Sequence, residues 1–169
     1  MDAQLIRVSP KRDWATAGSA AVAREVEAAQ GSERILDLEK AWAGIHFLLT
    51  AEVPITREDA IRLGISWDDD SLENALMGGR PTDLETSSGP VRYLDSDEIS
   101  RIAAKLADIS IEEFSDRYDP DALTEEQIPP DVWDNESEAR DWLASSYAKL
   151  REFYQETAAQ NAGLLIYLM

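Results

Sequence analysis

The stretch from Leu36 to Leu49 constrains the fold of this chain more than any other, because it is apolar almost all round. Four of its large side chains recur at the spacing of one helical face: Leu38, Trp42, Ile45 and Leu49. Phe47 and Leu48 lie off that face, so a helix formed by this stretch is apolar on most of its sides. The pattern predicts a central helix, from about Leu36 to Leu49, that other elements cover on most sides.

Short strands are expected near both ends of the chain. Ala3–Val8 has the composition of a strand with two different faces, and Val91–Leu94 is a further short strand. Leu164–Met169 is a nearly continuous apolar run, which is typical of a strand buried on both faces and therefore central in its sheet. The remaining patterns are mostly helical. We therefore predict an α+β fold: a helix-rich single domain over residues 1–169, with a small mixed sheet of about three to four strands that includes the N- and C-terminal segments.

Local signals mark where several helices begin and where loops lie. Three pairs have the spacing of a capping box and predict helix starts: Asp95/Glu98, Ser110/Glu113 and Asn135/Glu138. Arg80–Gly89 is rich in turn-forming residues and is expected to be a loop. Asp119–Pro130 contains three prolines and is expected to be another.

Composition narrows the classes of function. With no cysteine, the chain cannot form disulfides, thiolate zinc sites or cysteine nucleophiles. No apolar run has the length of a signal peptide or a membrane span, so a cytoplasmic location is expected. The formal net charge of -18 disfavours binding to nucleic acid or to an anionic membrane.

The negative charge is concentrated in one segment. Between Asp108 and Asp141 the chain has thirteen acidic side chains against Arg117 and Arg140, so eleven of the eighteen excess charges lie there. One interpretation is a partner-binding face that attracts a basic protein, as in an adaptor or an immunity-type inhibitor. Its candidate residues are Glu112, Glu113, Asp116, Asp119, Asp121, Glu125 and Glu126. The alternative is that these carboxylates only keep the protein soluble.

A second hypothesis is a small-molecule-binding protein or a hydrolytic enzyme with a pocket around Trp42, His46 and Arg92, with Arg80 and Tyr93 close by. His46 is the only histidine and a candidate for proton transfer, but a lone histidine on an apolar helix is more often a hydrogen-bonded core residue. Arg92, inside an apolar strand, could equally form a buried salt bridge. The chain has no G-x-S-x-G or HExxH motif and no complete catalytic set, so we predict no metal and no cofactor.

Several separated pieces of the chain resemble the YfbM-like family of small bacterial proteins. They are the opening strand into Arg7-Val8-Ser9-Pro10, Leu36–Thr50, Ala75–Gly79, Gly89–Leu94, Arg117–Pro120 and the Phe153-Tyr154 helix before the last strand. The resemblance implies an α+β fold and no established reaction. Two positions depart from the family's pattern. Pro129-Pro130 stands where a tyrosine usually precedes a proline before Trp133, and Ser88 stands where an aromatic often precedes Gly-Pro.

Overall fold

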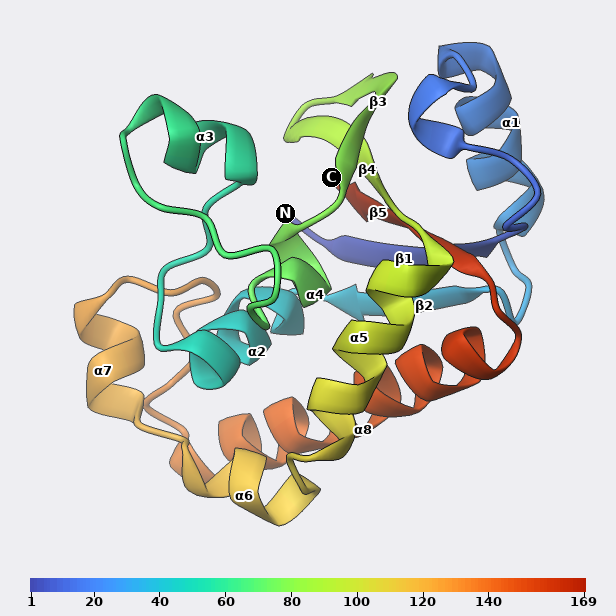
Figure 1. Cartoon of the computed structure of the whole chain (residues 1–169). Helices are drawn as coiled ribbons and strands as arrows, with labels where there is room; N and C mark the ends of the chain where they lie inside the picture. The colour runs from blue at the N-terminus through green and yellow to red at the C-terminus, as the bar shows by residue number, and fades with distance from the viewer.

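The computed structural model describes all residues, 1–169, and its centre is a five-stranded sheet (Figure 1). The strands are β1 Ala3–Val8, β2 Ile35–Glu39, β3 Arg80–Thr86, β4 Gly89–Leu94 and β5 Gly163–Leu168. Their order is β2-β1-β5-β4-β3, and every neighbouring pair is antiparallel. The expected α+β class and the central position of the last strand are confirmed. The expected mixed sheet of three to four strands is wrong in both number and direction.

Eight α-helices and one 3-10 turn surround the sheet. They are the turn η1 Trp14–Thr16 and the helices α1 Ser19–Ala29, α2 Ala41–Thr50, α3 Arg57–Arg62, α4 Asn74–Met77, α5 Ser96–Ala107, α6 Ile111–Asp116, α7 Pro120–Glu125 and α8 Glu136–Ala159. Helix α8 packs along α5, α6 and α2. In Figure 1, η1 and α1 lie on one side of the sheet, and α2, α5, α6 and α8 lie on the other. No helix in the molecule combines the length and the apolar character needed to cross a membrane.

The sheet separates two hydrophobic cores of unequal size. The larger lies under α2, α5 and α8 and receives Leu5 from β1, Leu94 from β4 and Ile166 from β5. The smaller lies under η1 and α1 and contains Trp14 and Tyr93. Strand β5 contributes to both cores, because successive residues of a strand point to opposite faces. This explains why its sequence is apolar without alternation.

The predicted helix Leu36–Leu49 is wrong in its first turn. Residues Ile35–Glu39 form β2, which pairs with β1, and the helix begins only at Ala41. The break falls at Glu39, whose φ of 48° is left-handed and therefore incompatible with a right-handed helix. Leu38 is buried in the same core as Trp42, so the apolar pattern was real, but a strand and a helix share it.

The two expected loops both contain regular structure. Arg80–Gly89 is not a loop but a hairpin, in which β3 and β4 pair across a short turn from Thr86 to Gly89. Within the segment Asp119–Pro130, residues Pro120–Glu125 form α7. The Asp119 side chain accepts a hydrogen bond from the Ala122 N–H at 3.0 Å, and Pro120 occupies the first turn, where a proline does not break a helix.

Two of the three expected capping boxes are present. Asp95 with Glu98 begins α5, and Ser110 with Glu113 begins α6, each with both reciprocal hydrogen bonds. At the start of α8 the Asn135 side chain makes no capping bond to the backbone. Its Nδ2 instead donates to Glu138 Oε2 at 2.6 Å.

We expect Asp95→Ala to lower the free energy of unfolding by about 1 kcal/mol, because the backbone N–H groups of Asp97 and Glu98 lose their acceptor. Urea unfolding measures the change, and Asp97→Ala, at an exposed position in the same turn, serves as the control. An equal effect of both substitutions would contradict a specific capping contribution.

Candidate functional site

The two residues of the predicted pocket that lie on α2 are buried. Trp42 is 5% exposed and His46 is 2% exposed. The Trp42 indole N–H donates to the Met1 carbonyl at 3.2 Å, which ties α2 to the start of β1. Neither side chain presents a surface to a ligand in this conformation, so a ligand-binding role for them stays a prediction.

His46 is buried without any hydrogen-bond partner. Neither Nδ1 nor Nε2 contacts a donor or an acceptor of the chain. Burial lowers the pKa of His46 from 6.5 to about 4, because the charged imidazolium would lose its hydration. The imidazole is therefore neutral at pH 7. Of the two interpretations of His46, the structure agrees with the core residue, but the side chain is not hydrogen-bonded.

Arg92 is 1% exposed and makes no ion pair with a carboxylate. Its Nε donates to the Gly78 carbonyl at 3.1 Å and its Nη2 to the Leu76 carbonyl at 3.2 Å. These carbonyls lie at the C-terminal end of α4, where a cation is favoured. Burial lowers the pKa of Arg92, and Glu58 opposes this shift. The buried salt bridge that was one of the two alternatives for Arg92 is not formed, and Arg92 instead joins β4 to α4.

Arg80 and Tyr93 come together on the other face of the sheet. They are paired residues of β3 and β4, and the Arg80 guanidinium lies 5.5 Å from the centre of the Tyr93 ring. Arg80 also forms an ion pair with Asp13 at 3.2 Å. Burial raises the pKa of Tyr93, and so do the carboxylates of Asp95 and Asp13. The five predicted pocket residues are thus divided between two faces of the sheet.

The seven candidate partner-binding carboxylates are all exposed on or beside α6 and α7. Three of them have local roles. Asp119 caps α7, and Asp116 pairs with Arg140 at 2.8 Å. Glu113 accepts a hydrogen bond from the Ser110 N–H, which lowers the pKa of this carboxyl. The other four carboxylates form no hydrogen bond or ion pair within the chain: Glu112, Asp121, Glu125 and Glu126. We call these four the acidic surface.

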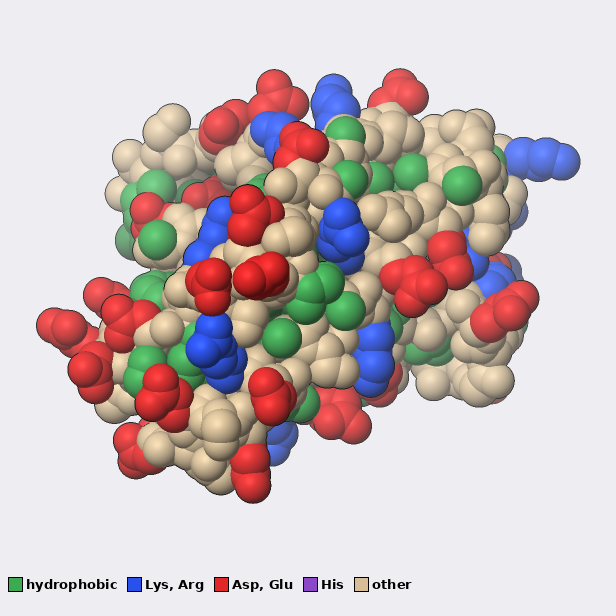
Figure 2. Space-filling view, turned by 90° about the horizontal axis from the view of Figure 1, so that it is seen from below, with side chains coloured by type: hydrophobic (Ala, Val, Ile, Leu, Met, Phe, Trp, Pro, Cys, Tyr) green, Lys and Arg blue, Asp and Glu red, His purple; other side chains and the backbone are tan.

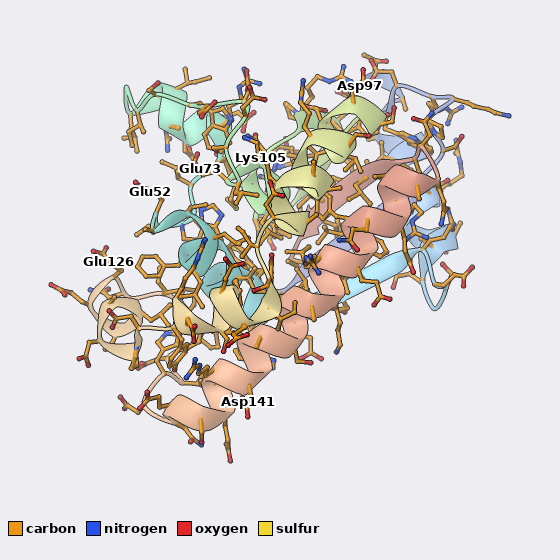
Figure 3. All side chains as sticks on the ribbon, turned by 60° about the horizontal axis from the view of Figure 1, so that its bottom comes forward. Glu52, Glu73, Asp97, Lys105, Glu126 and Asp141 are labelled. Carbon is orange, nitrogen blue, oxygen red and sulfur yellow. The ribbon has the colours of Figure 1, made fainter.

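The two arginines of this segment are engaged elsewhere in the fold. Arg117 donates to the Leu48 and Leu49 carbonyls at 3.3 and 3.5 Å, at the end of α2. Arg140 donates to Ser115 as well as to Asp116. Neither pairs with a member of the acidic surface. In Figure 2 the acidic side chains outnumber the basic ones on the left, the side on which α6 and α7 lie in Figure 1. Glu126 and Asp141 lie toward this same end of the molecule (Figure 3).

Two further residues of this region have geometry that the sequence did not single out. Val132 is 46% exposed, and Trp142 is partly exposed and stacks on Trp133, with ring centres 6.4 Å apart. Both line hollows of the surface beside several carboxylates. Their only sequence signal is an apolar side chain directly after an aspartate, Asp131 or Asp141. No group of three or more His, Asp or Glu side chains is close enough to hold a metal ion.

Comparison with known proteins defines the class to which this fold belongs. The chain belongs to the family described as a domain of unknown function (DUF1877), whose model matches residues 2–167. The crystal structure of YfbM from Escherichia coli, a protein of unknown function, is similar over 100% of both chains, with a TM-score of 0.66 and 17% sequence identity. The YfbM-like resemblance seen in the sequence is confirmed, and the structural likeness shows a shared fold. No curated protein matches the chain.

Proposed function

We propose that this protein is a non-enzymatic interaction module whose acidic surface binds a basic protein partner, as an adaptor or an immunity-type inhibitor does. The observation that supports the proposal is that Glu112, Asp121, Glu125 and Glu126 are exposed and have no counter-charge in the chain. A carboxylate that is already solvated and unpaired loses no internal interaction when a partner's lysine or arginine approaches it.

The physical consequence is fast, salt-sensitive association. Clustered charges of one sign attract an oppositely charged partner over about 10 Å at 0.1 M salt, and this attraction shortens as the ionic strength rises. The same field repels nucleic acid and anionic lipid, which leaves a basic protein as the proposed partner. We propose a cytoplasmic protein as this partner.

The test is affinity capture from a lysate of the source organism at low and at high salt, read by quantitative mass spectrometry. We expect wild-type protein to retain one basic protein in near-stoichiometric amount at low salt and to release it at high salt. A variant with Glu112→Gln, Asp121→Asn, Glu125→Gln and Glu126→Gln should lose most of this partner. Its free energy of unfolding should change by less than about 1 kcal/mol, because the four side chains are exposed.

A matched variant controls for net charge alone. It neutralises four exposed carboxylates outside the acidic surface: Glu27→Gln, Glu33→Gln, Asp83→Asn and Glu85→Gln. This control should retain the partner. Equal retention by both variants, or no protein retained above background at either salt, would overturn the proposal.

A further inference from the structure

Two neighbouring hollows of the surface meet at the same pair of apolar side chains. They have volumes of about 540 and 590 Å³, and both are lined by Val132 and Trp142. One lies before the start of α8 and beside its first turns, and the other lies against β2 and the residue before β1. We call the two together the Trp142 groove.

Trp142, the apolar floor of the groove, packs on a buried side chain. Trp142 stacks on Trp133 at an interplanar angle of 28°, and Trp133 is 1% exposed. The Trp133 indole N–H donates to the Ile128 carbonyl at 2.7 Å, which fixes its ring. Trp142 makes no hydrogen bond through its own indole N–H. A rigid aromatic ring with an unused donor is therefore available at the surface.

Carboxylates surround this floor on both sides. Asp131, Asp134 and Glu138 line one hollow, and Asp2, Asp37 and Glu39 line the other, with Lys40 as the single basic residue. None of the six carboxylates takes part in an ion pair within the chain.

Asp2 has an additional feature. Its Oδ1 is buried and accepts no hydrogen bond from the chain. A cation in the groove would lie close to this carboxylate, which lines one of the two hollows.

We infer that the Trp142 groove binds an arginine-containing basic segment of a protein partner, with one arginine stacked on the Trp142 ring. Guanidinium groups are planar, stack on indole rings and donate two hydrogen bonds to one carboxylate, whereas an ammonium group offers only a point charge. A Trp142 ring among six carboxylates matches these properties of arginine in shape and in charge. The inference rests on the proposed function and adds a second contact for the same basic partner, outside the acidic surface, together with the chemistry of its recognition.

The test uses the full chain and two synthetic peptides of equal length and charge. In one peptide arginine alternates with alanine, and in the other lysine replaces every arginine. We expect the arginine peptide to bind about threefold or more tightly than the lysine peptide, because only arginine gains from stacking. Its addition should move one indole N–H signal in the NMR spectrum. Trp142→Phe should remove that signal from the spectrum, which identifies it.

Two variants of equal charge locate the binding. The groove variant carries Asp131→Asn, Asp134→Asn and Glu138→Gln, and its matched control carries Glu27→Gln, Glu33→Gln and Asp83→Asn, which lie outside both the groove and the acidic surface. All six side chains are exposed, and thermal melts establish that both variants fold. We expect the groove variant to bind the arginine peptide about tenfold more weakly than wild type, and the control to change less than about threefold.

Each other outcome overturns the inference and separates it from the proposed function. Equal losses in both variants would mean that peptide binding depends only on the overall charge of the protein, so the groove would be refuted. No saturable binding to wild type at low salt would also refute the groove. The acidic surface would then still be judged by its own capture experiment and its own variants.

Discussion

Trp133→Ala is expected to lower the free energy of unfolding by about 3–5 kcal/mol, the largest single effect we predict for this protein. Trp133 is 1% exposed, and its indole N–H donates to the Ile128 carbonyl at 2.7 Å. Its ring also packs against the backbone of α2: a methyl group added at Gly44 would lie 2.9 Å from the Trp133 Cη2 atom. Truncation therefore leaves a cavity between α2 and α8 and a carbonyl without a donor.

Urea unfolding of the variant and of wild type measures this loss. Trp142→Ala is the matched control, because it removes the same side chain from a partly exposed position of the same stacked pair. We expect the control to cost less than about 2 kcal/mol. If Trp133→Ala does not fold, Trp133→Phe keeps a ring but loses the hydrogen bond, at an expected cost of about 1–3 kcal/mol. Equal costs for Trp133→Ala and Trp142→Ala would contradict the structure.

The second large effect is a loss of stability on acidification that depends on His46. Burial lowers the pKa of His46 to about 4 in the folded protein, against an ordinary value of 6.5. Above pH 6.5 the imidazole is neutral in both states and contributes no pH dependence. Between pH 6.5 and pH 4 the unfolded chain takes up the proton first, so acid favours unfolding. This difference between the folded and unfolded pKa of His46 lowers the free energy of unfolding by about 3 kcal/mol at and below pH 4.

His46→Leu isolates this effect from the many carboxylates that also titrate. As the pH falls from 7 to 4, the free energy of unfolding of wild type should decrease by about 3 kcal/mol more than that of the variant. Because His46 is the only histidine, its NMR titration can be followed directly. A midpoint near 6.5 in the folded protein, or a difference that does not change with pH, would show that the imidazole is not buried as described.

The same measurement bears on the catalytic hypothesis for His46. A proton-transfer group that works at neutral pH needs a pKa near 7 and contact with the reacting atom. His46 has a lowered pKa and 2% exposure, and both its ring nitrogens lack a partner. These properties favour a role for His46 in packing rather than in proton transfer. They also explain why replacing it with leucine should be tolerated at pH 7.

The elements that could be read from the sequence are those set by interactions between near neighbours. The capping pairs Asp95/Glu98 and Ser110/Glu113 lie three residues apart and define the starts of α5 and α6 without help from the rest of the chain. The apolar run of β5 likewise indicates a central strand, because burial on both faces leaves no polar position. The family resemblance rests on such local pieces, and the family match confirms it.

Elements that depend on distant partners were missed. Ile35–Glu39 is a strand because β1 offers it an edge, and the same residues fit a helical pattern when read alone. Arg80–Thr86 is a strand because β4 pairs with it, although its composition is that of a loop. Pairing energy comes from hydrogen bonds across the sheet, which no local spacing reports.

The sequence by itself determined the charge of the protein, the segment in which the carboxylates gather and the apolar character of α2 and β5. Only the tertiary structure decided which charged groups are free. Arg92 was joined to two carbonyls and separated from Tyr93 by the sheet, Arg117 was directed to the end of α2, and Trp142 was brought to the surface beside β2. The physical reason is that charge and hydropathy belong to each residue, whereas exposure and pairing arise from contacts between segments far apart in the chain.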